Sequence, residues 1–308
     1  MAMPDAQIGT VISPRQTSSF ETEGVPLRRA SLWGDAWRRL IKNKLAIAGG
    51  IGVLVLILTA LVADQLMRFG YARQHLADHG VSPSSTYWLG ADLLGRDLYS
   101  RIIYGARISM EVGLLTQLFA TLIGVTIGSL AGFYAGRTDN AIMRAVDVIY
   151  SIPVLFFAIL VMESLGKSVN HIILALSLTS WPIIARLTRA QMLSIREKEY
   201  IKAARLSGGR GWQIIMRHML PNSMTPIIVA ITFGIPAAIF TEATLSFFGI
   251  GVNPPIPSWG QMVAESVRSV RSYWFLAAFP STALGVTMLS FTFLGDGIRD
   301  ALDPRMNN

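Results

Sequence analysis

Six long apolar stretches of about 18–26 residues constrain the fold of this 308-residue chain more than any other feature. A helix needs ~20 apolar residues to cross the hydrocarbon core of a bilayer. Charged residues make up only 15% of the chain, whereas soluble domains carry about 25%. We therefore predict an all-α, polytopic membrane protein with six transmembrane helices. In chain order the stretches are Leu45–Ala63, Ser109–Tyr134, Ala141–Met162, His171–Thr188, Thr225–Phe248 and Phe275–Leu294.

The distribution of basic residues predicts the orientation of the chain. If the N-terminus lies inside, the inner segments carry 19 of the 27 Lys and Arg residues and the outer segments carry 8. Because cytoplasmic loops collect Lys and Arg, we expect both termini to be cytoplasmic. The net charge of +8 then reflects topology, and we expect no nucleic-acid partner. The chain contains no Cys, which excludes disulfides and thiolate metal sites.

The segments between the apolar stretches suggest a domain organisation. Residues 31–44 place Ala36, Trp37 and Leu40 on one helical face, which predicts an amphipathic helix at the inner membrane surface; the alternative is a basic flank of the first span. The remaining expected parts are a flexible cytoplasmic tail (1–30), the first transmembrane helix (45–63), an extracytoplasmic segment (64–108), a core domain (109–297) with a cytoplasmic loop (190–222) and an extracytoplasmic loop (249–274), and a cytoplasmic tail (298–308).

Small residues recur every four positions along the second stretch, at Gly124, Gly128, Gly132 and Gly136. Such a stripe lets a second helix approach closely inside a membrane, where packing drives helix association. We therefore interpret it as a helix-packing surface. The alternative is that the stripe lines a conduit.

Three acidic residues fall within the apolar stretches, where charge is costly. Glu111 lies at the outer edge of the second stretch, where we expect a solvated position; the other two are Asp147 and Glu242. Asp147 follows Arg144 by three residues, which favours an ion pair at the membrane interface over a substrate site. Glu242 lies near the outer end of the fifth stretch and either faces a conduit or caps a loop. Both are candidate pathway or gate residues.

The inner loop between the fourth and fifth stretches carries the most informative pattern. Residues 197–206 have helix-forming composition, and Gly208-Gly209 then ends that helix. A second amphipathic turn, Trp212–Leu220, leads through Pro221 back to the membrane. Small Ala203 and Ala204 would let a partner protein approach the backbone of the first helix. The alternative is an ordinary basic cytoplasmic loop.

This loop resembles the EAA loop of bacterial ABC-importer permeases. Ala203, Ala204, Gly208, Leu220 and Pro221 fall at the matching positions, whereas Lys202 replaces the Glu and His218 replaces the Ile of the pattern. An Arg-His-x-Leu-Pro-Asn ending, present at residues 217–222, is usual in the peptide-importer branch. Segments 88–109, 242–260 and 295–304 resemble the same branch, and in particular its C-type subunit of oligopeptide and dipeptide importers.

The resemblance implies the type I ABC-importer permease fold in a bacterial inner membrane and an ATP-driven import function. It implies three kinds of protein partner: a homologous permease subunit forming a heterodimer, two ATPase subunits, and an extracytoplasmic peptide-binding protein. The residues that it implies for ATPase coupling are Lys202, Ala203, Ala204, Arg205, Gly208, Arg210, Trp212, His218, Leu220 and Pro221.

The chain lacks the motifs of an enzyme that acts on its own. It has no Gly-x-x-x-x-Gly-Lys-Ser/Thr run to cradle phosphates, so we expect ATP and Mg²⁺ to bind partner ATPase subunits. We expect no catalytic residue, cofactor or metal on this chain. Other possible functions are a related ABC permease for nickel or another small solute, an ion-coupled secondary transporter and, least favoured, an intramembrane hydrolase.

Overall fold

The computed structural model describes residues 32–303. The predicted tail 1–30, Ser31 and residues 304–308 therefore lie outside the described part. Within it, every regular element is a helix, as the sequence predicted, and the only extended pairing is an isolated bridge between Ala91 and Asp97.

Five helical stretches of the described chain are long and apolar enough to cross a membrane. They are α2 (Lys44–Leu61), α4 (Leu98–Tyr134), α7 (Val169–Arg196), the continuous stretch Gly211–Phe247 that contains α9 and α10, and α12 (Phe275–Leu302). The 37 residues of α4 correspond to ~55 Å at a rise of 1.5 Å per residue. This exceeds the ~30 Å hydrocarbon core, so α4 extends well outside the membrane.

The third apolar stretch differs from the single span predicted over Ala141–Met162. It consists of two helices, α5 (Gly136–Tyr150) and α6 (Val154–Leu165), bent by 74° at a short break. Pro153 lies in the break, and a proline lacks the N–H of a continuous helix and disfavours helical backbone in the residue before it. Residues 32–303 therefore contain six candidate membrane spans only if this bent pair counts as one.

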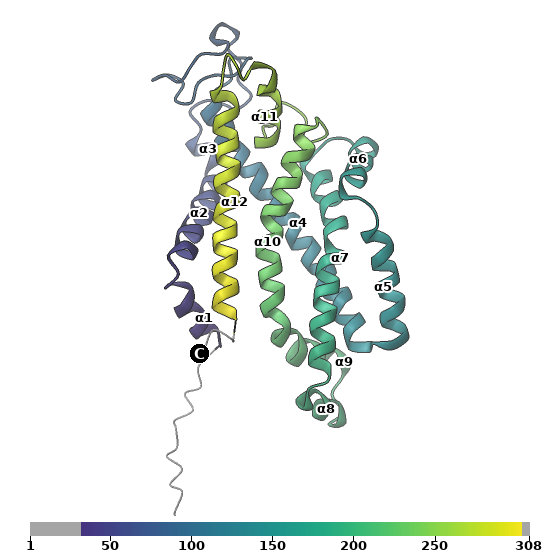
Figure 1. Cartoon of the computed structure of the whole chain (residues 1–308). Helices are drawn as coiled ribbons and strands as arrows, with labels where there is room; N and C mark the ends of the chain where they lie inside the picture. The colour runs from purple at the N-terminus through teal and green to yellow at the C-terminus, as the bar shows by residue number, and fades with distance from the viewer. Residues whose placement is uncertain (1–31, 304–308) are drawn as a thin grey trace, which may run out of the picture. The chain divides into compact units, whose positions relative to one another are not determined.

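Short elements occupy the two ends of the bundle (Figure 1). At one end lie α1 (Leu32–Leu40), α8 (Glu199–Leu206) and α9 (Gly211–Ile214), together with the end of α12. At the other end lie α3 (Ala63–Leu66), α11 (Trp259–Ser266) and the loops that surround them. The α1 and α8 end is the one that the basic residues predict to be cytoplasmic.

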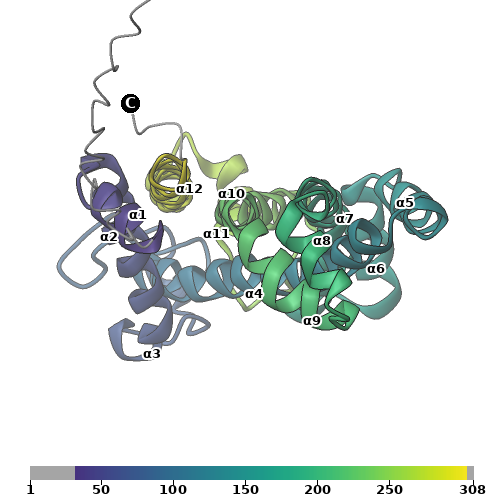
Figure 2. The same cartoon turned by 90° about the horizontal axis from the view of Figure 1, so that it is seen from below.

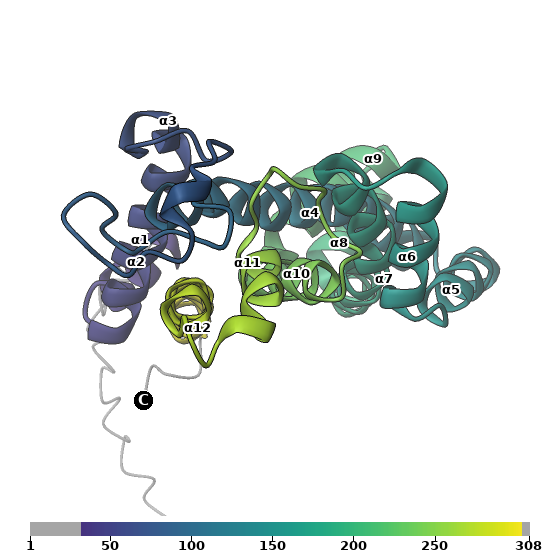
Figure 3. The same cartoon turned by 90° about the horizontal axis from the view of Figure 1, so that it is seen from above.

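The long helices pack in pairs. Helix α4 lies along α7, α2 lies along α12, and α10 (Leu220–Phe247) contacts both α4 and α12 (Figures 2 and 3). Gly49 allows the close approach of α2 to α12, because a Cβ there would stand 2.6 Å from the carbonyl oxygen of Ser290. This arrangement places α4, α7 and α10 together in the middle of the molecule.

Candidate coupling surface and extracytoplasmic clasp

A small buried cluster holds the cytoplasmic corner, which we define as residues 197–222. Ile201 of α8 and Ile214 of α9 are buried against Met192 and Ile195 near the end of α7. Met219, in the π-helical turn Ile215–Met219 that joins α9 to α10, completes the cluster. The corner is therefore packed firmly onto the two long helices that enter and leave it.

The outer side of the corner is exposed and partly apolar. Leu206 at the end of α8 is 90% exposed, and Trp212 at the start of α9 is 62% exposed. Figure 2, seen from below, shows α8 and α9 in front of the long helices, at one end of the bundle. Large apolar side chains in such a position suit a surface that another protein covers.

The coupling residues named from the sequence divide between the two sides of the corner. Ala204 and Leu220 pack against the buried cluster. The Arg205 guanidinium lies 4.9 Å from the centre of the Phe133 ring. The other predicted residues lie on the outside: Lys202, Ala203, Gly208, Arg210, Trp212, His218 and Pro221 are exposed.

Two glycines give the corner its turn. Gly208 has φ +76°, a backbone conformation that residues with a Cβ rarely adopt. Gly209 allows close approach, because a Cβ there would stand 2.8 Å from the carbonyl oxygen of Ala204. The two glycines that the sequence predicts to end the helix therefore have different roles. Gly208 adopts a left-handed backbone, and Gly209 leaves room for the backbone of α8.

The glycine stripe on α4 faces α7. A Cβ on Gly124 would stand 2.8 Å from the Trp181 carbonyl oxygen, and one on Gly132 would stand 2.9 Å from that of Arg189. Gly128 is equally crowded, against Ala185 and Thr188. Gly136 differs from the predicted packing role: α4 ends at Tyr134, and a Cβ on Gly136 would meet nothing within 4 Å. Its φ of +61° instead serves the turn into α5.

Asp147 pairs with a different arginine from the one the sequence suggested. Its carboxylate accepts a hydrogen bond from Arg186 of α7 at 2.6 Å, and no contact with Arg144 accompanies it in the described chain. Asp139, which lies earlier on the same helix α5, forms a bidentate ion pair with Arg189, also of α7. Two ion pairs thus fasten α5 to α7.

Glu242 is fully buried near the outer end of α10. Its Oε1 accepts a hydrogen bond from Ser246 at 2.6 Å. Ser246 in turn lies so close to Gly251 that the loop after α10 could not carry a side chain there. The Glu242 carboxyl group is therefore buried beneath that loop. Asp147, the other candidate pathway residue, pairs with Arg186, so the described contacts do not bring the two together.

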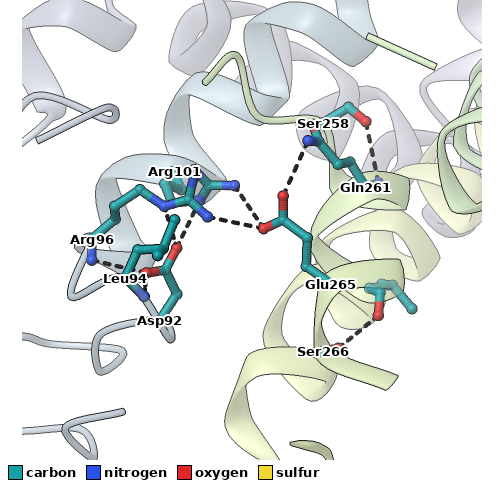
Figure 4. A network of polar contacts seen from close by, with 9 residues as sticks. Asp92, Leu94, Arg96, Arg101, Ser258, Gln261, Glu265 and Ser266 are labelled. Carbon is teal, nitrogen blue, oxygen red and sulfur yellow. Dashed lines mark hydrogen bonds and ion pairs between the residues drawn. The ribbon is translucent and has the colours of Figure 1, made fainter. Parts of the chain in front are cut away.

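A charged network in the extracytoplasmic part, not anticipated from the sequence, joins α4 to α11 (Figure 4). Arg96 donates to Asp92 at 2.5 Å and to Glu265 at 3.0 Å, and Arg101 donates to the same Glu265 oxygen at 3.2 Å. Arg101 is only 1% exposed. We call Asp92, Arg96, Arg101 and Glu265 the clasp; its two positive and two negative charges balance.

The loop beside the clasp is equally well fixed. Asp92 Oδ1 accepts hydrogen bonds from the backbone N–H groups of Leu94 and Arg96, which closes a tight turn. Nearby, burial and a hydrogen bond donated to Asp78 raise the pKa of Tyr87 above its ordinary value. The charge-rich run from Asp92 to Arg101 was the available sequence signal, but it did not reveal that Glu265 completes the network.

These features define a class of protein: a helical, multi-span membrane protein with an exposed, partly apolar corner at its cytoplasmic end. Within the described residues, no group of three or more His, Cys, Asp or Glu side chains could hold a metal ion. The ion pairs and glycine contacts join helices to one another.

Comparison with known proteins agrees with this class. Residues 124–308 match the family model of the binding-protein-dependent transport system inner membrane component. Residues 31–83 match the N-terminal transmembrane domain of oligopeptide transport permease C. The chain belongs to this family of inner-membrane transport components, as the resemblance of its cytoplasmic loop predicted.

Individual relatives cover nearly the whole chain. The dipeptide transport system permease protein DppC of Bacillus subtilis is 41% identical over 94% of this chain and 91% of its own. The oligopeptide transport system permease protein OppC of Bacillus subtilis is 38% identical over 96% and 97%. The glutathione transport system permease protein GsiD of Pectobacterium atrosepticum is 40% identical over 90% and 92%.

A solved structure shares the fold. An inward-facing form of the MetNI methionine ABC transporter matches with a TM-score of 0.56 and 18% identity, over 66% of this chain and 96% of its own. The protein is thus a multi-pass inner-membrane subunit with the fold of an ABC-importer permease. Membership of the family implies ATPase and substrate-binding partners.

Proposed function

We propose that this chain is one of two different transmembrane subunits of an ATP-driven peptide importer and forms half of its translocation pathway. The exposed apolar corner is the observation that carries the proposal, because Leu206 and Trp212 form a surface that the chain itself leaves uncovered. Relatives named for dipeptide and oligopeptide transport support the choice of substrate.

In this proposal the chain hydrolyses nothing itself. ATP and Mg²⁺ bind two partner ATPase subunits beneath the corner, and a homologous permease subunit supplies the other half of the pathway. An extracytoplasmic binding protein delivers the peptide at the end that carries the clasp.

The corner suits the transmission of motion. It follows α7 directly, and α9 and the π-helical turn run into α10 without a break. A partner that moves α8 therefore pulls on two long helices at once through the cluster around Ile201 and Met219. Rigid-body movement of packed helices is a recognised way to alternate the access of a central site.

The test is the substitution Leu206→Asp. Because Leu206 is 90% exposed, the change removes no packing within this chain, so any effect must pass through a partner. We expect at least a tenfold loss of co-purified ATPase subunit and of transport, because burying an unpaired carboxylate is costly. Leu76→Asp, at the opposite end and 69% exposed, is the matched control and should retain the ATPase subunit. If the Leu206→Asp chain co-purified with as much ATPase subunit as the parent chain, this result would contradict the proposal.

A further inference from the structure

A groove opens between the three central helices. It has a volume of about 240 Å³, and its walls come from α4, α7 and α10, with the start of α6 at one side. Small residues of α10 form much of one wall, namely Ala230, Gly234, Ala237 and Ala238. None of the residues that line the groove is charged.

The side chain of Gln117 carries the amide group of this groove and lies near the midpoint of α4, where the membrane core would be. It is only 4% exposed. Its Nε2 donates to Thr121 at 3.3 Å, whereas its Oε1 accepts no hydrogen bond from any described residue. Polar groups inside membranes are rare and commonly functional.

The opposite wall is shaped around this carboxamide. Gly234 leaves room for the carboxamide group, because a Cβ there would collide with Oε1, Cδ and Nε2 of Gln117. The hydroxyl groups of Ser180 on α7 and Thr241 on α10 also line the groove. Thr241 donates its proton to Ala237 of its own helix, which leaves its oxygen lone pairs available.

We propose that this groove is one wall of the translocation pathway and that Gln117 binds the main chain of the peptide in transit. This inference rests on the proposed function. A carboxamide offers both a donor and an acceptor, as a peptide bond does, and can pair with any peptide whatever its side chains. The absence of charge keeps binding weak enough for the peptide to leave, which conduction through a pore requires.

The first experiment uses the lack of cysteine in this chain. Ser180→Cys, in the full complex reconstituted in vesicles, is labelled with a water-soluble thiol reagent during ATP turnover, with or without trialanine. We expect labelling that trialanine slows at least fivefold. Thr282→Cys, an exposed position on α12 outside the groove, is the control and should not respond to trialanine.

Two results would overturn the proposal. One is a Ser180→Cys chain that stays unlabelled under both conditions; the other is labelling at a rate that trialanine does not change. A disulfide formed with a cysteine placed on the second permease chain would identify the groove as a subunit interface instead. The parent complex reports separately on the proposed function, because it must import trialanine in every case.

The second experiment tests Gln117 itself. Gln117→Met keeps the shape of the side chain and removes the carboxamide. We expect the KM for trialanine to rise about fivefold, because the variant loses one hydrogen bond between neutral groups. We also expect the preference for trialanine over its N-methylated form to shrink. Thr292→Val, which removes a hydroxyl bonded only within α12, is the control and should change neither quantity. A Gln117→Met complex with unchanged KM and unchanged preference would contradict the assignment.

Discussion

At the scale of single residues, local periodicity was readable from the sequence and distant partners were not. The four-residue spacing of glycines indicated a packing face because helical geometry is set by neighbours in the chain. Three of those glycines face α7, whereas Gly136 lies just beyond the end of α4. Asp147 illustrates the limit: Arg144 was its neighbour in sequence, but the docking of α5 on α7 gives it Arg186.

Gly128→Leu should destabilise the protein, because a side chain there would meet the backbone of Ala185 and the side chain of Thr188. Overpacking of a well-packed interface costs about 1–3 kcal/mol. The midpoint of thermal unfolding in detergent is the measurement. Gly285→Ala on α12 is the matched control, because its Cβ would meet nothing within 4 Å and helical Ala is favoured over Gly by about 0.5–1 kcal/mol. A Gly128→Leu protein as stable as the control would contradict the close packing of α4 and α7.

The two ion pairs between α5 and α7 should differ in strength. Asp139 is 7% exposed at the side chain and makes two hydrogen bonds to Arg189, so Asp139→Ala should cost about 2 kcal/mol. Asp147 and Arg186 are 60% and 42% exposed, so Asp147→Ala should cost less than about 1 kcal/mol. Chemical denaturation of the purified protein measures both. Equal losses, or a larger loss at Asp147, would refute this ranking.

At the scale of elements, the sequence predicted where a helix ends more reliably than whether a long helix is uninterrupted. Gly208-Gly209 predicted the end of a helix, and α8 ends at Leu206. Composition alone could not show that the third stretch divides near Pro153 into two helices bent by 74°. Other prolines, such as Pro182 and Pro236, remain inside helices because neighbouring helices hold their turns in place.

Gly208→Val should weaken the corner without any steric clash. Nothing lies within 4 Å of a Cβ at this position, so the only penalty is the left-handed backbone, which costs a residue with a Cβ about 1–2 kcal/mol. We expect substrate-stimulated ATPase activity of the assembled complex to fall severalfold. Gly208→Asn should retain most of the activity, because Asn tolerates this backbone conformation better than β-branched residues do. Equal activities of the two variants would show that the turn does not matter for coupling.

At the scale of the whole molecule, hydropathy and charge predicted the helical membrane architecture. The clasp and the groove, by contrast, form only when distant parts of the chain pack together. The all-helical membrane fold followed from six apolar stretches. The clasp could not be predicted, because Arg101 and Glu265 are 164 residues apart and meet only after α11 docks beside α4. The groove depends equally on long-range packing, because Gln117 and Gly234 belong to different helices.

The central claim is that this chain couples ATP hydrolysis on partner subunits to peptide import. The most direct measurement is uptake of radiolabelled trialanine by vesicles that contain the complete complex. We predict that uptake stops when ATP is depleted and continues when an ionophore dissipates ion gradients. Uptake that survives ATP depletion but stops with the ionophore would identify an ion-coupled transporter and contradict the account.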